Sequence, residues 1–360
     1  MNGKYKALWL NKNDNLVVLD QRILPFVEKT ITITNTDECV KAIKNMTVRG
    51  AGVIGNTAAF GVFLASCECN GDLKLLEEKA KLIRSSRPTA VNLMWAVDRM
   101  MEVAKVTKKD KMQERLKQEA IKICDEDCKA TEKIANFGAD IFEEIMKKNS
   151  KKEINVLTHC NAGWLAIVDS GTALAPIYEA QKRGIKIHVW VDETRPRNQG
   201  ANLTAWELEK GGIDHTVIAD NTGGHLMQHG LVDVCITGAD RVSLGGDVAN
   251  KIGTYLKALA ASDNNIPFYV ALPSSTFDFK VIDGIKEIDI EIRGEDEVKM
   301  IRGVDEKGQY RELQIVPTHS KALNYGFDVT PSRLITGLIT ERGVCKADIK
   351  EIQKLYKDIL

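Results

Sequence analysis

The sequence has no excess of either charge, because 50 lysine and arginine residues balance 50 aspartate and glutamate residues in 360 positions. A neutral chain lacks the positive surplus with which proteins bind nucleic acids or anionic membranes. Apolar runs of the roughly 20 residues that cross a bilayer are also missing. The N-terminal stretch MNGKYKALWLNKND has no apolar signal core. We therefore expect a cytoplasmic protein that binds neither nucleic acid nor membrane.

Cysteine is sparse and irregularly spaced, with eight residues at positions 39, 67, 69, 124, 128, 160, 235 and 345. Irregular spacing in a long chain without an export signal favours reduced thiols over a disulfide framework. Two close pairs, at 67/69 and 124/128, lack the second pair or histidine cluster that a four-ligand zinc site needs. We expect no metal site.

The length of the chain favours two domains, which we place at residues 1–130 and 131–360. Helical patterns occupy 38–46, 56–68, 72–86 and 89–106, and two short apolar runs at 15–20 and 31–36 predict a small sheet. A charged helical stretch at about 111–148 is the candidate connection between the domains.

The pattern changes from about residue 154, where strand-length apolar runs alternate with helical segments. The runs lie at 154–160, 185–192, 214–220, 232–240 and 267–273, with helical segments that include 203–212 and 249–264. Near-continuous apolar strands that alternate with helices indicate a buried parallel sheet. The predicted fold is therefore α/β: a small helix-rich N-terminal domain with a small sheet, and a doubly wound, Rossmann-like C-terminal domain.

Two chemically useful side chains end strands of this predicted sheet. Ligands of such sheets bind beyond the carboxyl ends of the strands, where Cys160 and Asp240 should face one crevice. Cys160 could be a buried small apolar residue, but the loop after it suggests a helix N-terminus that would stabilise a thiolate. Asp240 could be a helix cap, or a desolvated acid with a raised pKa. His159 should point to the opposite face of its strand and have a packing role.

Two glycine-rich segments are typical of phosphate binding. Gly50 to Gly55 reads GAGVIG, with Arg49 beside it, and residues 245–251 read GGDVANK before a predicted helix. Glycines at a helix start expose backbone N–H groups to an anion. A nicotinamide site is disfavoured because no strand precedes the first segment. Arg87 is a third candidate anion contact.

Eight segments occur in the order RGAGVIGNTAAFG, SRPTAVNL, THCNAG, ETRPRNQGANLTAWEL, TGADRV, GDVANKIGTY, LPSSTFD and FDVTPSRLITGLITERG. Together they resemble the methylthioribose-1-phosphate isomerase family, which shares its fold with regulatory subunits of the eukaryotic translation-initiation exchange factor. The resemblance covers about residues 20–345. It implies an isomerase of methionine salvage that converts 5-methylthioribose 1-phosphate to its ketose, as a cytoplasmic homodimer without metal or organic cofactor.

The resemblance also implies roles for individual residues. Asp240 would be the acid for ring opening, and Cys160 would take part in hydrogen transfer, by a proton route or beside a hydride shift. The implied substrate contacts are Arg49, Gly50, Ala51, Arg87, Gln199, Asn250 and Lys251.

Three departures from the family pattern leave the substrate open. Gly52 replaces the usual proline, Trp164 follows the cysteine loop, and Arg197-Asn198 precede the QGA motif. The alternatives are 5-deoxyribose 1-phosphate, which a pocket shortened by Trp164 would favour, and ribose 1,5-bisphosphate. A regulatory subunit should have lost Cys160 or Asp240, and both are present.

Overall fold

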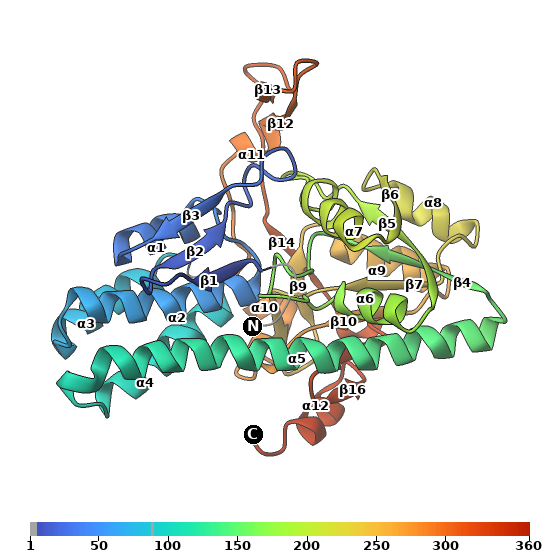
Figure 1. The fold of residues 1–360 in the computed structure, drawn as a ribbon. Coiled ribbons are helices and arrows are strands. Elements are labelled where there is room, and N and C mark those ends of the chain that lie inside the picture. The colour runs from blue at the N-terminus through green and yellow to red at the C-terminus, as the bar shows by residue number, and fades with distance from the viewer. Residues whose placement is uncertain (1–5, 88–89) are drawn as a thin grey trace.

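The computed structural model describes residues 6–87 and 90–360, which form two domains side by side (Figure 1). The N-terminal domain has an antiparallel sheet in the order β1-β2-β3, as the runs at 15–20 and 31–36 predicted. Side chains cap two of its helices: Asn35 accepts from Glu38 N, and Asp72 accepts from Lys74 N and Leu75 N. The elements are β1 Leu8–Leu10, β2 Leu16–Leu19, β3 Thr30–Ile33, α1 Thr36–Lys44, α2 Ala51–Glu68, α3 Leu73–Arg84 and α4 Val91–Lys105.

Helix α2 is the centre of this domain and begins five residues before its predicted start at 56. Its length and composition would suit a membrane crossing, yet most of it is covered by protein. Small residues along it let neighbours approach closely. A Cβ at Gly61 would lie 2.4 Å from Cys39 Sγ, and one at Gly52 would lie 2.3 Å from Ile167.

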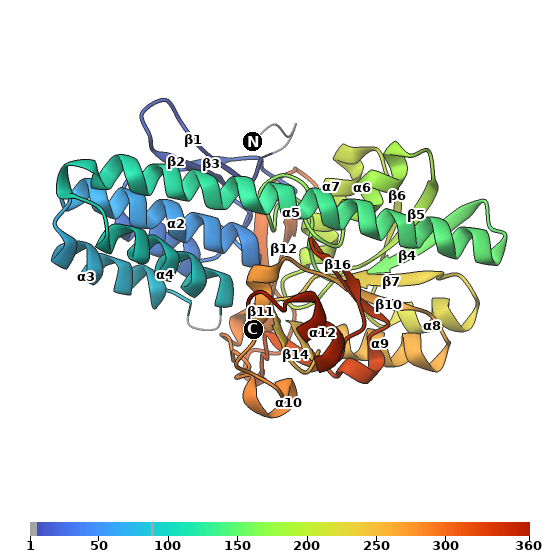
Figure 2. The same cartoon turned by 90° about the horizontal axis from the view of Figure 1, so that it is seen from below.

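Helix α5, Met112–Asn149, connects the domains and is the longest helix of the described residues. It has 38 residues, so it is about 57 Å long. Its first half contacts α2 and α4, and its second half contacts α6 and β15 (Figure 2). The predicted connection at 111–148 is therefore a helix, and the predicted domain boundary at 130 lies inside it.

The C-terminal domain contains a seven-stranded sheet in the order β16-β15-β10-β7-β4-β5-β6. All neighbours are parallel except β15 and β16. The chain adds β5 and β6 on one side of β4, and β7, β10 and β15 on the other. The topological switch point therefore lies between β4 and β7, where open sheets bind ligands. The strands are β4 Glu153–Thr158, β5 Lys186–Asp192, β6 Asp214–Ile218, β7 Val234–Thr237, β10 Phe268–Ala271, β15 Gly337–Thr340 and β16 Gly343–Cys345.

Helices cover both faces of this sheet, which confirms the doubly wound, Rossmann-like prediction. Apolar residues of α5, α6 and α7 form one core with β4 and β5, and those of α8, α9 and α12 form another. These helices are α6 Ala175–Lys182, α7 Ala205–Gly211, α8 Thr222–Gln228, α9 Thr254–Asp263 and α12 Ile349–Leu355. A π-helical turn, Gly200–Thr204, leads into α7.

Smaller elements between β7 and β15 form a second sheet in the order β11-β8-β9-β14 and a protruding hairpin of β12 and β13 (Figure 1). The helix predicted over 249–264 is wrong in its first part, because Val248–Lys251 pairs with β14 as a strand. These elements are β8 Arg241–Ser243, β9 Val248–Lys251, β11 Phe277–Asp278, α10 Gly284–Glu287, α11 Asp296–Lys299, β12 Met300–Val304, β13 Tyr310–Gln314 and β14 Phe327–Thr330.

Candidate active site

One cavity of about 60 Å³ lies at the switch point, between the end of β4, the loop after β7 and the start of α2. All nine site residues predicted from the sequence line it, although they come from both domains. They are Arg49, Gly50, Ala51, Arg87, Cys160, Gln199, Asp240, Asn250 and Lys251. The structure thus brings the predicted set together, and the roles of its members remain predictions.

Cys160 lies two residues after the end of β4 and has a left-handed backbone, with φ of +67°. Its amide donates to Thr194 Oγ1 at 2.8 Å and its thiol to Gln199 Oε1 at 3.4 Å. Burial raises the pKa of the thiol, while the charges of Arg49 and Lys251 oppose that rise. The predicted helix N-terminus is wrong, because residues 161–174 form a loop before α6.

Asp240 follows β7 and is half-buried against the cavity. Its amide donates to Ala249 O at 2.9 Å, so β9 fixes its backbone. Removal from water raises the pKa of the carboxyl group, against the opposing charges of Lys251 and Arg87. The predicted direction of this pKa shift is therefore confirmed, and a carboxyl group that keeps its proton can act as an acid.

The glycine-rich segment at 50–55 contributes to the cavity through its first three residues. Gly50 is the N-cap of α2 with φ of +92°, and a Cβ there would lie 2.6 Å from Ala166 Cα. Of the first N–H groups of α2, that of Val53 donates to Ala166 O at 2.9 Å. Gly52 also lines the cavity and packs against Ile167, which accounts for glycine at the position where proline is usual.

Cations surround the two central groups. Lys251 is buried on β9, where its Nζ donates to Gly326 O at 2.8 Å and lies 4.9 Å from the centre of the Phe327 ring. Burial lowers the pKa of both Lys251 and Arg87. Arg87 forms an ion pair with Glu291 at 3.6 Å, and Pro88 and Thr89 of its motif lie outside the described residues.

A second cavity of about 110 Å³ adjoins the first, and both are lined by Met46, Arg49 and Gln199. Two arginines of its lining have carboxylate partners: Arg197 contacts Glu297 at 2.9 Å and Arg302 contacts Glu312 at 3.1 Å. Apolar side chains supply much of the remaining lining, namely Leu24, Leu203, Met300 and Ile301.

Trp164 was expected to shorten the substrate pocket, and that expectation is wrong. It is 5% exposed, and its ring centre lies 5.3 Å from that of Trp206. In the part of the chain that the structure describes, Trp164 lines neither of the two cavities.

Comparison with known proteins places these residues in a family. The model of the Initiation factor 2 subunit family matches residues 48–347. A methylthioribose-1-phosphate isomerase of Sulfurimonas denitrificans is 62% identical, with 99% of this chain and 100% of that protein covered. One of Paramagnetospirillum magneticum is 52% identical over 98% of each. The chain belongs to the methylthioribose-1-phosphate isomerases of the Initiation factor 2 subunit family.

Solved structures of this family have the same fold. The 5-methylthioribose 1-phosphate isomerase of Pyrococcus horikoshii superposes with a TM-score of 0.84 at 37% identity, covering 99% of this chain and 97% of that one. Translation initiation factor eIF-2B, subunit delta, from A. fulgidus gives 0.81 at 37% identity, covering 98% and 100%. The fold therefore occurs in an isomerase and in a protein named as an initiation factor subunit.

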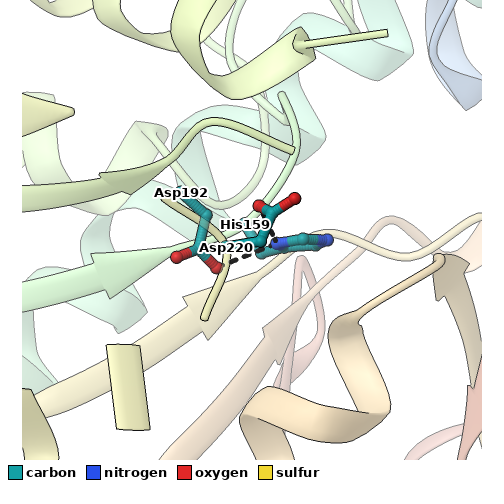
Figure 3. Close-up of side chains that lie close together, drawn as sticks. All are labelled: His159, Asp192 and Asp220. Atoms are coloured by element: carbon teal, nitrogen blue, oxygen red, sulfur yellow. Dashed lines mark hydrogen bonds and ion pairs between the residues drawn. The ribbon is translucent and has the colours of Figure 1, made fainter. Parts of the chain in front are cut away.

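A buried polar cluster of His159, Asp192 and Asp220 lies outside the cavity lining (Figure 3). His159 Nδ1 lies 2.9 Å from Asp192 Oδ2, and Nε2 lies 2.8 Å from Ile252 O. The three side chains His159, Asp192 and Asp220 are near enough to share a metal ion. Lys257 Nζ, however, already lies 3.2 Å from Asp192 Oδ2. The cluster therefore has its own cation, and it supports the packing role predicted for His159.

The structure adds Met46, Asn161 and Phe327 to the cavity lining, which the sequence did not single out. Asn161 lies within the THCNAG segment, so its position beside Cys160 was an available signal. Met46 and Phe327 carry no such signal, because apolar residues of this kind also fill cores.

Proposed function

We propose that this protein isomerises 5-methylthioribose 1-phosphate to 5-methylthioribulose 1-phosphate. The observation that carries the proposal is the meeting of Cys160 and Asp240 in one cavity with Arg49, Arg87 and Lys251. A carboxyl group of raised pKa can donate a proton, and the cations can hold a phosphate. The curated relatives that are 62% and 52% identical bear the name of this reaction.

The first chemical step is ring opening, which the phosphate on C1 prevents from occurring spontaneously. Asp240 donates its proton to the ring oxygen as the C1–O bond breaks, so that oxygen becomes the C4 hydroxyl group. C1 is left electron-poor, with the phosphate oxygen sharing its positive charge. Hydrogen then moves from C2 to C1. The proton on the C2 hydroxyl returns to Asp240 as the C2 carbonyl forms, and the carboxyl group is restored.

The role of Cys160 depends on how that hydrogen moves. A thiolate could take it from C2 as a proton and return it to C1, or it could move directly as a hydride. Burial raises the pKa of the Cys160 thiol, which disfavours the thiolate. This direction supports a hydride shift, with the neutral thiol donating to Gln199 and shaping the cavity. A substrate deuterated at C2 separates the routes, because only the proton route exchanges its label with water.

The second cavity supports a methylthio group on C5. Arg197 donates a hydrogen bond to Glu297 at 2.9 Å and Arg302 donates one to Glu312 at 3.1 Å, so a carboxylate already holds each guanidinium. The ion pair of Arg87 with Glu291, at 3.6 Å, is longer than a hydrogen bond and leaves Arg87 better able to bind a phosphate. Met46, at the junction, and apolar Leu24 and Leu203 suit a thioether. This arrangement counts against ribose 1,5-bisphosphate.

The test is to measure kcat/KM for 5-methylthioribose, 5-deoxyribose and ribose 1,5-bisphosphate substrates, the first two as 1-phosphates. We expect the methylthio sugar to be preferred over the deoxy sugar by about 10–200-fold, the range for a small apolar difference. A preference for the bisphosphate would refute the apolar subsite. Absence of turnover with all three sugars would refute the enzymatic proposal and favour a regulatory subunit.

We also propose that the protein acts in the cytoplasm as a homodimer without a cofactor. The eight cysteines are free thiols, which fits a reducing compartment. Sedimentation analysis of the purified protein tests the dimer, and a monomer at working concentration would contradict it.

A further inference from the structure

Glu207 of α7 is fully buried and is not part of the cavity lining. Its carboxylate nevertheless accepts four hydrogen bonds from the loop after Cys160 and from α6. Oε1 accepts from Asn161 Nδ2 at 2.8 Å and Leu165 N at 3.0 Å. Oε2 accepts from Trp164 N at 2.9 Å and Tyr178 OH at 3.2 Å. A carboxylate accepts at both oxygens, whereas a neutral amide accepts at one.

The Asn161 side chain links this carboxylate to the cavity. Its amide N–H groups donate to Glu207 Oε1 and, at 3.2 Å, to Thr204 Oγ1. With both donors directed away, its Oδ1 must face the opposite way, and there it accepts from Arg49 Nη1. The main-chain oxygen of Asn161 accepts from Arg49 Nη2 at 2.6 Å. Loss of the Glu207 charge would allow the amide to turn, and its N–H₂ would then face a guanidinium.

The loop after Cys160 packs so closely on the Glu207 carboxylate that it leaves no room for a side chain at Gly163. A Cβ at Gly163 would lie 1.9 Å from Glu207 Oε2, so the loop can follow the carboxylate only with glycine there. Thr204 and Glu207 are three residues apart, which places both on one face of the helical segment. Thr204 Oγ1 also donates to Cys160 O at 2.7 Å. One helical turn thus fixes both Cys160 and the residue that orients Arg49.

We propose that Glu207 is a positioning residue that fixes the Asn161 amide and, through it, aims the Arg49 guanidinium at the phosphate of the substrate. The proposal rests on the proposed function in one respect, namely that Arg49 contacts a bound anion. It assigns Glu207 no contact with substrate.

The experiment measures binding of inorganic phosphate by calorimetry to the full chain and three variants: Glu207→Gln, Arg49→Ala and the double variant. We expect each single change to weaken binding about tenfold or more, in the range seen when a group that orients a ligand residue is lost. The double variant should bind no more weakly than Arg49→Ala, because Glu207 acts through that side chain. Additive losses, or unchanged binding by Glu207→Gln, would overturn the proposal.

The matched control is Asp233→Asn. Asp233 is also buried and accepts from Asn155 N at 2.8 Å and Asn155 Nδ2 at 3.2 Å, at the opposite end of β4 from the cavity. It should leave phosphate binding unchanged, and equal weakening by this control would reduce Glu207 to a general stability role. If Glu207→Gln does not fold, Asn161→Ala removes the same link and should give the same loss.

The two proposals fail in different ways. Phosphate binding needs no turnover, so the link from Glu207 to Arg49 can hold even if no sugar phosphate is isomerised. Conversely, turnover of 5-methylthioribose 1-phosphate with unchanged phosphate binding in Glu207→Gln would leave the function standing and remove the positioning role.

Discussion

The two domains each bury a carboxyl group, but they surround it differently. In the C-terminal domain, Glu207 has four donors around it, two of them main-chain amides. In the N-terminal domain, Asp127 of α5 accepts from Asn56 Nδ2 at 2.6 Å, and Asn56 Oδ1 has no partner among the residues that the structure describes. Burial raises the pKa of each group to about 7. The same desolvation therefore acts on a richly bonded carboxyl group and on a poorly bonded one.

The number of hydrogen-bond donors separates Glu207, which organises a site, from Asp127, which only lowers the stability of the fold. The folded pKa of each carboxyl group lies above its usual unfolded value of about 4. Folding therefore becomes less favourable as pH rises from about 4 to about 7, where the unfolded chain ionises first. At Glu207 the buried carboxylate lowers the stability of the fold but also orders the loop beside Cys160. Among the described residues, Asp127 orders no part of the active site.

The largest effects should come from the two central residues of the C-terminal domain. Asp240→Asn should lower kcat by at least about 10²-fold, because it removes the acid for ring opening. Cys160→Ser should lower kcat by a similar factor, because the thiol either carries the hydrogen as a proton or shapes the cavity in which the hydride moves. Thermal melting should stay near that of the wild type, since both face a cavity. Nearly normal turnover in either variant would remove that residue from the mechanism.

Loss of a single cation should act on binding more than on chemistry. Lys251→Ala and Arg87→Ala should raise KM about 10–100-fold, because a charge-assisted contact contributes about 1.5–3 kcal/mol. Inorganic phosphate should compete with substrate in the wild type. If a high concentration of phosphate left the apparent KM for the substrate unchanged, the anion site would be contradicted. Glu207 would then have no binding site to organise, and the contrast with Asp127 would fail.

Titration of Glu207 should appear in KM rather than in kcat. Its carboxylate accepts four hydrogen bonds, so protonation as pH falls below about 7 should loosen the Asn161 loop and raise KM several-fold. The phosphate of the substrate also titrates near pH 6, so Glu207→Gln serves as the reference. Parallel KM profiles in wild type and variant would show that the Glu207 charge does not matter.

The smallest effect should be a gain of stability in the N-terminal domain. Asp127→Asn removes the ionisable group and keeps an oxygen for Asn56, so it should stabilise the fold by about 1 kcal/mol or more at pH 8. Urea unfolding should show this gain shrinking as pH falls from about 7 towards 4. Turnover should be unchanged, and a loss of activity would mean that Asp127 supports the site after all.

Much of the active site followed from the sequence because a parallel sheet gathers its strand ends at one edge. Cys160 and Asp240 end the two apolar runs that contain β4 and β7. The switch point of the sheet lies between these two strands. The glycine at the start of α2 was recognisable for a similar local reason, since Gly50 needs a positive φ.

Other features depended on contacts between segments far apart in the chain. The pattern at 249–264 predicted a helix, yet pairing with β14 made residues 248–251 a strand and placed Asn250 and Lys251 along it. Trp164 packs on Trp206, away from the pocket it was expected to shorten. Neither partner is visible from local spacing.

The sequence by itself therefore determined the fold class and placed Cys160 and Asp240 at one sheet edge, because local periodicity and strand ends carry that information. The seven substrate contacts were implied by the resemblance to a family. Only the tertiary structure decided the pKa direction and the orientation of these side chains. Burial raised the pKa of the Cys160 thiol where a helix N-terminus was expected to lower it. It also turned Glu207, which looks in sequence like any acidic residue of a helix, into the acceptor that orders the loop after Cys160. The physical reason is that desolvation and hydrogen-bond partners depend on which distant segments close over a side chain.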